Sequence, residues 1–127
     1  MHEKHLYDYA VIRVVPKVER EEFVNVGLML LCKRQKYLRI EYQIPTEKIM
    51  AFCSEFDIEQ VQINIDSFVK ICNGKSDGGP IGQFAIEERF RWLTAVKSSS
   101  IQTSRPHSGF SSDLDATFEK LYAELVL

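Results

Sequence analysis

Runs of apolar residues in the first third of the chain predict three β-strands. Residues 7–15 are rich in β-branched and aromatic side chains and end at Pro16, which cannot donate to a sheet ladder. Residues 22–32 are apolar on both faces, which predicts a central strand covered on each side. Residues 37–42 alternate apolar and polar side chains, the pattern of a half-exposed strand. The short links between these runs indicate an antiparallel meander.

Apolar residues recur at helical spacing after this region. Thr46 is the expected N-cap of a first helix, because its hydroxyl can accept a hydrogen bond from a free backbone N–H group. Asp57 is expected to cap a second helix, with Gln60 completing a capping box. The Asn73-Gly74 pair predicts the end of that helix, since glycine adopts the left-handed conformation that helix ends favour.

The last part of the chain predicts two further helices. Residues 83–95 carry apolar side chains at helical spacing, and Ser112 is expected to start a final helix with Asp113 and Asp115 in its first turn. Residues 98–112 predict a hydroxyl-rich loop or a short edge strand. Strands followed by helices are typical of the α+β class. We therefore expect an antiparallel β-meander of three to four strands with helices packed on it.

Size and charge narrow the possible classes of protein. The 127 residues predict a single domain, 1–127, with a core of its own. The net charge of −2 gives no general basic field for nucleic acid or membrane. The three cysteines are odd in number and widely spaced, so no disulfide framework is expected, and they lack a Cys-x-x-Cys pair that would indicate zinc. Without a long apolar run or an apolar signal core, the chain is expected to be cytoplasmic.

The predicted central strand breaks two rules of strand composition, at Asn25 and Gly27. Asn is depleted in strands and Gly weakens them. A bulge, a close backbone approach or a site is therefore expected here. Arg20 and Glu22 stand at the start of the strand. They predict either a salt-bridged turn or a pair of charges that fix the strand end near Asn25.

The segment 89–112 is the strongest candidate for a binding site. It contains nine Ser or Thr residues and no Asp or Glu, together with Arg91, Gln102, Arg105 and His107. Guanidinium groups, hydroxyls and loose backbone amides favour a phosphate or carboxylate ligand. The segment thus predicts an anion-binding domain for a nucleotide or nucleic acid. The alternative is a solvated loop followed by a capped helix, whose first-turn carboxylates would compete with an anion.

No catalytic or cofactor motif accompanies these residues. Glycine-rich phosphate loops, dinucleotide fingerprints and spaced metal-binding carboxylates are absent from the sequence, so neither a metal nor a cofactor is expected. His107 can serve as a general base, because histidine exchanges protons near neutral pH, and a hydrolase stays open as an alternative to a structural histidine. Trp92 beside Arg91 fits a core position or a binding hot spot.

Two blocks of sequence carry a resemblance to a known family. The first joins residues 7–16 to residues 20–27, and the second is 89–95 with its continuation to position 109. Together they cover nearly the whole chain, and they resemble the bacterial domain-of-unknown-function family 3037. Val96 stands where many members have Pro. The recurrent polar positions of the family fall on Arg20, Glu22, Asn25, Thr94, Ser99, Gln102 and His107.

The resemblance implies an accessory or partner-binding role, since some members are encoded beside a protein similar to toxin-type serine kinases. We therefore interpret the chain as a non-enzymatic protein-interaction module with a kinase-like partner, and the anion-binding domain is the alternative. Both interpretations need the two blocks to meet. We expect residues 99–104 to lie beside the first strands, with Asn25 and Gln102 on the same side of the domain.

Overall fold

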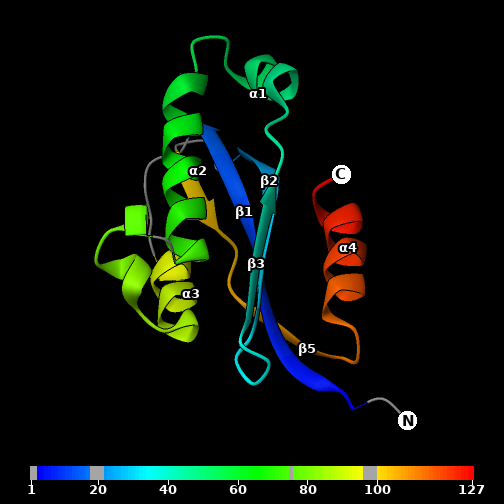
Figure 1. Ribbon diagram of the computed structural model, residues 1–127. Helices are drawn as coiled ribbons and strands as arrows, with labels where there is room; N and C mark the ends of the chain where they lie inside the picture. Colours follow the sequence, from blue (N-terminus) through cyan, green and yellow to red (C-terminus); the bar gives the residue numbers. More distant parts are fainter. Residues whose placement is uncertain (1–2, 18–21, 75, 96–99) are drawn as a thin grey trace.

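The computed structural model describes residues 3–17, 22–74, 76–95 and 100–127. Its strands are β1 (His5–Lys17), β2 (Glu22–Cys32), β3 (Tyr37–Tyr42), β4 (Ile101–Thr103) and β5 (His107–Ser111). Its α-helices are α1 (Thr46–Phe52), α2 (Ile58–Asn73), α3 (Ile86–Ala95) and α4 (Leu114–Leu125). The antiparallel sheet lies between α2 and α3 on one side and α4 on the other (Figure 1). The prediction of an α+β fold with helices packed on a meander is confirmed.

The strand β1 is the longest and is shared by three neighbours. The sheet order is β3-β2-β1-β4, and β5 also pairs with β1. The first half of β1 pairs with β5 and its second half with β4, both antiparallel. Between these two short strands, Ser104 continues the pairing: the Val11 N–H donates to the Ser104 hydroxyl at 2.9 Å, and the Ser104 N–H donates to the Val11 carbonyl at 2.8 Å.

These two strands come from the segment that the sequence left open as a loop or an edge strand. Residues 101–103 and 107–111 are both strands at the edge of the sheet. Each is short and rich in hydroxyl side chains, so neither has the apolar alternation that marks a strand in sequence. Pairing with β1 therefore decides their conformation, and it raises the number of strands to five.

Two separate apolar clusters fill the space on the two faces of the sheet. Alternate residues of β1, such as Ile12 and Val14, pack with α2 and α3, and Val11 between them packs toward α4. The same division holds in β2, where Met29 faces the larger cluster and Leu28 the smaller. The expectation that residues 22–32 form a strand covered on both faces is therefore confirmed.

A β-bulge in β2 explains the glycine in this otherwise apolar strand. Ile12 lies opposite Gly27 and Arg13 lies opposite Asn25, so Val26 is the extra residue. A β-carbon on Gly27 would stand 2.8 Å from the Glu41 carbonyl oxygen, inside van der Waals contact. The bulge and the close backbone approach expected from the sequence are thus both present.

The local signals of the helix ends are confirmed in part. The Asp57 carboxylate accepts a hydrogen bond from the Gln60 N–H at 3.0 Å, and Gly74 ends α2 with φ of 68°. The capping box is wrong, because the Gln60 side chain donates to Asn64 instead. Thr46 is the first residue of α1 and not its N-cap, since Pro45 takes that position without a side-chain bond.

The last helix begins one residue later than expected. Asp113 is the N-cap of α4, and its carboxylate accepts a hydrogen bond from the Ala116 N–H at 3.1 Å. Ser112 therefore lies just outside the helix. Asp115 remains in the first turn, as expected.

One arginine of β3 connects α4 to the sheet. The Arg39 guanidinium carbon lies 4.2 Å from the centre of the Phe118 ring, which is fully buried under the helix. Its two terminal nitrogens donate to Asp115 at 3.2 Å and to Glu119 at 2.6 Å. Because both carboxylates are largely exposed, the buried ring contact contributes more to stability than the ion pairs do.

We expect Gly27→Ala to lower the free energy of unfolding by about 1–3 kcal/mol, because the new methyl group meets a backbone carbonyl that the β2–β3 ladder holds in place. Gly109→Ala is the matched comparison in β5. There the new methyl group would meet the outer end of the Tyr7 side chain, which can move aside. Urea unfolding of both variants checks the order, and an equal loss in the two would contradict it.

Candidate functional site

Three planar polar side chains stand in one row across the sheet. Arg13 of β1 lies opposite Asn25 of β2 on one side and opposite Gln102 of β4 on the other. Direct partners in an antiparallel sheet point to the same face. The prediction that residues 99–104 lie beside the first strand is therefore confirmed for 101–103, and Asn25 and Gln102 are on one face.

The row lies next to the end of α4. The Asn25 side-chain amide donates to the Leu125 carbonyl at 3.0 Å, which places the row on the α4 face. The Asn25 Oδ1 and Arg13 Nε atoms are buried without a hydrogen-bond partner. Phe23 lies over the Arg13 guanidinium, 4.2 Å from its carbon to the ring centre, and the phenylalanine is 47% exposed.

An aromatic cluster continues this face toward the start of β1. His107 of β5 lies opposite Tyr9 of β1, with 5.3 Å between the two ring centres. Tyr7 follows at 6.3 Å from Tyr9. A β-carbon on Gly109 would stand 2.5 Å from the Tyr7 hydroxyl oxygen and 2.7 Å from the ring, so the Tyr7 ring lies across this glycine. His107 is thus part of a row of aromatic rings. In the sequence it was a single candidate for a general base without a neighbouring partner.

Two candidates from the second sequence block lie on the opposite face of the sheet. Arg91 and Thr94 belong to α3, and the Thr94 carbonyl accepts a hydrogen bond from the Thr103 hydroxyl at 3.2 Å. Trp92 on the same helix is 40% exposed, so its interpretation as a core residue is wrong. The sequence candidates therefore divide between two faces and do not form one composite site.

The remaining candidates lie at the start of a strand, in a link between strands or outside the described residues. Arg105 is exposed in the link between β4 and β5, and Glu22 is half-buried at the start of β2. Arg20 and Ser99 lie outside the described residues.

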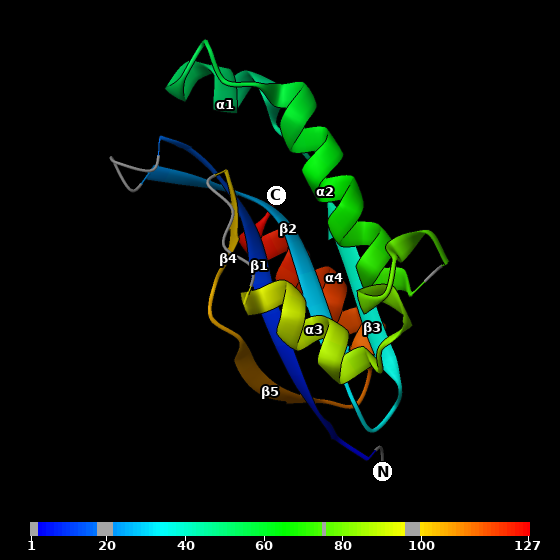
Figure 2. The same cartoon turned by 90° about the vertical axis from the view of Figure 1, so that its left-hand side faces the viewer.

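A long open groove lies on the α3 side, where β1 begins. Figure 2 shows α3 crossing the sheet above the start of β1 and the end of β5. Two hollows of about 630 and 340 Å³ adjoin here, because Asp8, Leu31 and Lys33 line both. We call them together the α3 groove. The larger hollow also has Lys4, His5, Leu6, Arg34 and Phe110, and the smaller has Glu87, Phe90, Arg91, Thr94 and Pro106.

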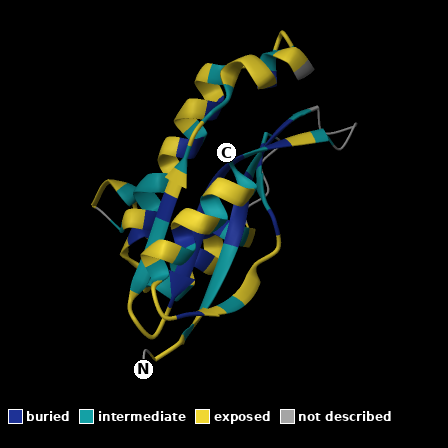
Figure 3. Cartoon of the chain, turned by 90° about the vertical axis from the view of Figure 1, so that its right-hand side faces the viewer, coloured by how far each residue is buried: buried dark blue, intermediate teal, exposed yellow. Residues whose placement is uncertain are grey.

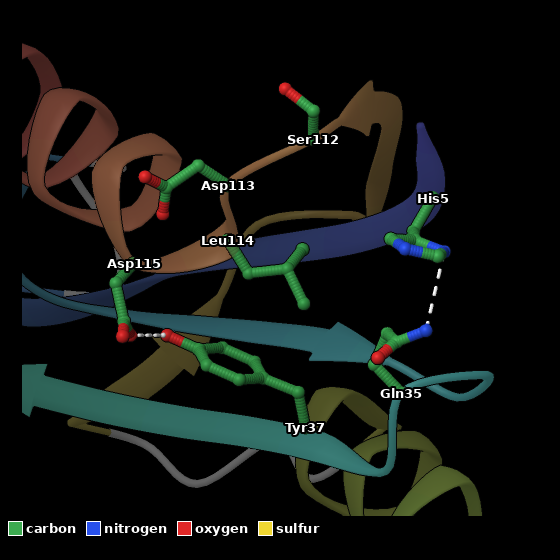
Figure 4. Close-up of a pocket in the computed structure, with 7 residues that line it drawn as sticks. All are labelled: His5, Gln35, Tyr37, Ser112, Asp113, Leu114 and Asp115. Carbon is green, nitrogen blue, oxygen red and sulfur yellow. Dashed lines mark hydrogen bonds between the residues drawn. The ribbon is translucent and has the colours of Figure 1, made fainter. Parts of the chain in front are cut away.

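The hollow of about 590 Å³ at the start of α4 has a different character (Figure 4). Leu114 points into it between Tyr37 and His5. Several of its polar groups already have partners: Asp115 accepts a hydrogen bond from the Tyr37 hydroxyl at 2.6 Å, and Gln35 lies 3.4 Å from the His5 ring nitrogen. The arrangement holds α4 against the β2–β3 turn and leaves little for a ligand to bind.

The described residues contain no cluster of three or more His, Cys, Asp or Glu side chains that could hold a metal ion. Burial raises the pKa of the Cys72 thiol to about 12, so this cysteine is a poor nucleophile at neutral pH. Cys32 is likewise buried and Cys53 is half-buried. None of the described helices combines the length and apolar character needed to cross a bilayer.

Comparison with family models assigns residues 9–126 to the model described as Protein of unknown function (DUF3037). The chain belongs to the DUF3037 family. No curated protein and no solved structure matches it. The matched range includes the polar row and most of the residues that line the α3 groove.

Sequence reasoning missed the apolar part of the groove in this DUF3037 protein. Leu6 lies opposite Phe110 in the β1–β5 pair, and they are 54% and 69% exposed. In the sequence, Leu6 is one apolar residue beside a predicted strand, and Phe110 stands among serines and glycine. Only the pairing of β5 with β1 brings them together. The one available signal was the aromatic residue itself, in a segment otherwise made of polar and small side chains.

The pKa of Tyr37 leads to an alkaline prediction. Burial, with the hydrogen bond to Asp115, raises this pKa from 10.0 to about 12. A group whose pKa is higher in the folded state stabilises the fold below its unfolded pKa, and this contribution disappears as pH rises toward 12. Wild-type protein should therefore lose more unfolding free energy between pH 9 and pH 11 than Tyr37→Phe does. Denaturant unfolding at both values checks this, and parallel losses would contradict it.

Proposed function

We propose that this DUF3037 protein is a non-enzymatic docking module that holds an acidic, partly apolar segment of a partner protein in the α3 groove. The observation that carries the proposal is the pair Leu6 and Phe110. They are direct neighbours on the open end of the sheet, and both are more than half exposed. Contiguous exposed apolar residues with a polar border are characteristic of interaction surfaces.

The apolar pair forms one wall of a hollow and is not an isolated surface feature. Leu31 lines the same hollow as this pair and also lines the smaller hollow. The buried Phe90 is part of the lining of the smaller hollow. Apolar side chains thus follow the groove from its open end toward α3. A partner side chain that entered here would leave water at roughly 25 cal/mol for each Å² of apolar surface buried.

The charges around the groove favour an acidic partner. Lys4, Lys33, Arg34 and Arg91 line it, against the carboxylates of Asp8 and Glu87. Glu3 also pairs with Arg34 at 3.4 Å, so four cations against three anions leave a local excess of one positive charge, in a chain whose net charge is −2. The Asp8 carboxylate already accepts a hydrogen bond from the Ser108 hydroxyl at 2.5 Å. Complementary charge would steer an acidic segment to the groove and orient it there.

The edge of β5 adds a way to bind an extended segment. Among the described strands, β5 pairs only with β1, so its other edge is open beside Phe110. Peptides frequently bind by adding a strand to such an edge, with alternate side chains entering a neighbouring pocket. We therefore expect an extended segment in which apolar and acidic residues alternate. A kinase-like protein, the partner class that the family resemblance implies, is the first one to test.

A labelled short peptide in which Glu alternates with Leu is a direct probe of the groove. We expect it to bind more tightly than the same peptide with Lys in place of Glu. Phe110→Ala should weaken its binding by about 2 kcal/mol, roughly thirtyfold, as truncation of an aromatic hot spot does. Lys33→Glu should also weaken it, whereas the charge-matched control Lys48→Glu on α1 should not. Fluorescence anisotropy measures the affinity of both peptides for the wild-type protein and of the Glu peptide for each variant. Equal binding of the two peptides would contradict the charge argument.

Site-specific photocrosslinking in the cells that make the protein addresses the natural partner. A crosslinking amino acid at position 110 should capture a peptide that carries Asp or Glu beside an apolar residue. The matched control is position 84, because Phe84 is also an exposed aromatic residue, 44% exposed, but lies outside the groove. Capture of the same peptides from both positions, or of peptides without acidic residues, would contradict the proposal.

A further inference from the structure

We propose that the opposite face of the sheet binds single-stranded nucleic acid. The surface consists of the aromatic rings of Tyr7, Tyr9, His107 and Phe23 with the polar row Arg13, Asn25 and Gln102, and we call it the aromatic strip. It shares strands β1 and β5 with the α3 groove but none of its side chains. The proposal is independent of the docking function and goes beyond it.

The first argument is the presence of flat aromatic rings. The Tyr7 ring lies across Gly109, where any β-carbon would collide with it, so the glycine allows the ring to lie close to the strand. The His107 and Tyr9 rings are 33° from parallel with 5.3 Å between their centres, and His107 is exposed. Rings that lie on an antiparallel sheet are platforms on which unpaired bases stack.

The second argument is the chemistry of the polar row. Arg, Asn and Gln side chains are the groups that form paired hydrogen bonds with base edges. Here they stand in adjacent strands in one register. The Asn25 amide nitrogen is bonded to the Leu125 carbonyl, and the Asn25 Oδ1 and Arg13 Nε atoms are buried, so the terminal nitrogens of Arg13 and the Gln102 amide are the groups that would meet a base edge. The Phe23 ring over Arg13 provides a further exposed aromatic surface at this end of the strip.

The third argument is the spacing and the coverage of this face. Arg13 lies four positions after Tyr9 in β1, about 13 Å at the rise of a strand, so the rings and the polar row would contact different nucleotides of one strand. The helix α4 makes its main sheet contacts with β2 and does not cover the whole face. Figure 3 shows this face, with strand residues visible beside α4.

The charge of the protein defines what kind of binding to expect. Among the described side chains, Arg13 in the strip and the exposed Arg105 in the β4–β5 link are candidates for phosphate contacts. With two phosphate contacts, the logarithm of the affinity should fall with the logarithm of the salt concentration with a slope of about −1.4. This shallow slope separates binding by stacking from nonspecific binding to a basic surface. A duplex should bind more weakly, because its bases are already stacked on one another.

The test uses short labelled RNA and DNA of one mixed sequence, single-stranded and duplex, at low salt. We expect binding of the single strands, measured by fluorescence anisotropy, with a preference for RNA or DNA to be read from the same experiment. His107→Ala should weaken binding at least about fivefold, the effect of losing one stacked base. His107→Phe should retain it, because the aromatic face remains. Phe23→Ala gives an independent second measurement at the other end of the strip.

Phe84→Ala is the matched control, since it removes an exposed aromatic side chain away from the strip. It should leave binding unchanged, and a thermal melt of each variant checks that the fold is intact. Three results would overturn the proposal: no binding of either single strand, equal loss in the Phe84→Ala control, or binding with a steep salt slope that His107→Ala and Phe23→Ala do not alter. Because His107 lies outside the α3 groove, His107→Ala should still bind the acidic peptide.

Discussion

The strand β2 is apolar on both faces, and the rest of the structure depends on this constraint. A strand of this kind is stable only when each face of the sheet is covered. On one face α2 and α3 supply the cover, with sixteen buried residues in the shared cluster. On the other face the chain must return after α3, and the single helix α4 closes the smaller cluster around Phe118. The β4–β5 segment is the route that this return takes.

Both open surfaces are consequences of this incomplete coverage. The helix α3 packs on β2, β3 and β4, and Leu6 and Phe110 in the β1–β5 pair stay exposed. The helix α4 is held over β3 by Arg39 and at its end by Asn25, and it leaves His107 of β5 and Phe23 of β2 exposed. A sheet that is wider than its helical layers leaves two strips of side chains, and their chemistry differs because alternate residues of a strand face opposite sides.

The sequence predicted the elements whose signals are local. The three leading strands, the Asp57 cap and the Gly74 end of α2 all depend on neighbouring residues only. The placement of β4 and β5 depends on contacts with β1 about ninety to a hundred positions away, and their short sequences carry no apolar alternation. The polar row was predictable as a juxtaposition, since strand composition fails at Asn25. Its third member, Arg13, was hidden in an ordinary apolar strand.

The strand β5 separates the two proposed ligands while placing them on one support. His107 and Gly109 lie on the face of the aromatic strip, and Ser108 and Phe110 lie on the face of the α3 groove. The two ligands would therefore touch different residues of this five-residue strand. One ligand can influence the other through the position of β5 itself. Side-chain hydrogen bonds of Ser108 with Asp8 and of Ser111 with Thr117 hold that position, which makes them the contacts through which such coupling would act.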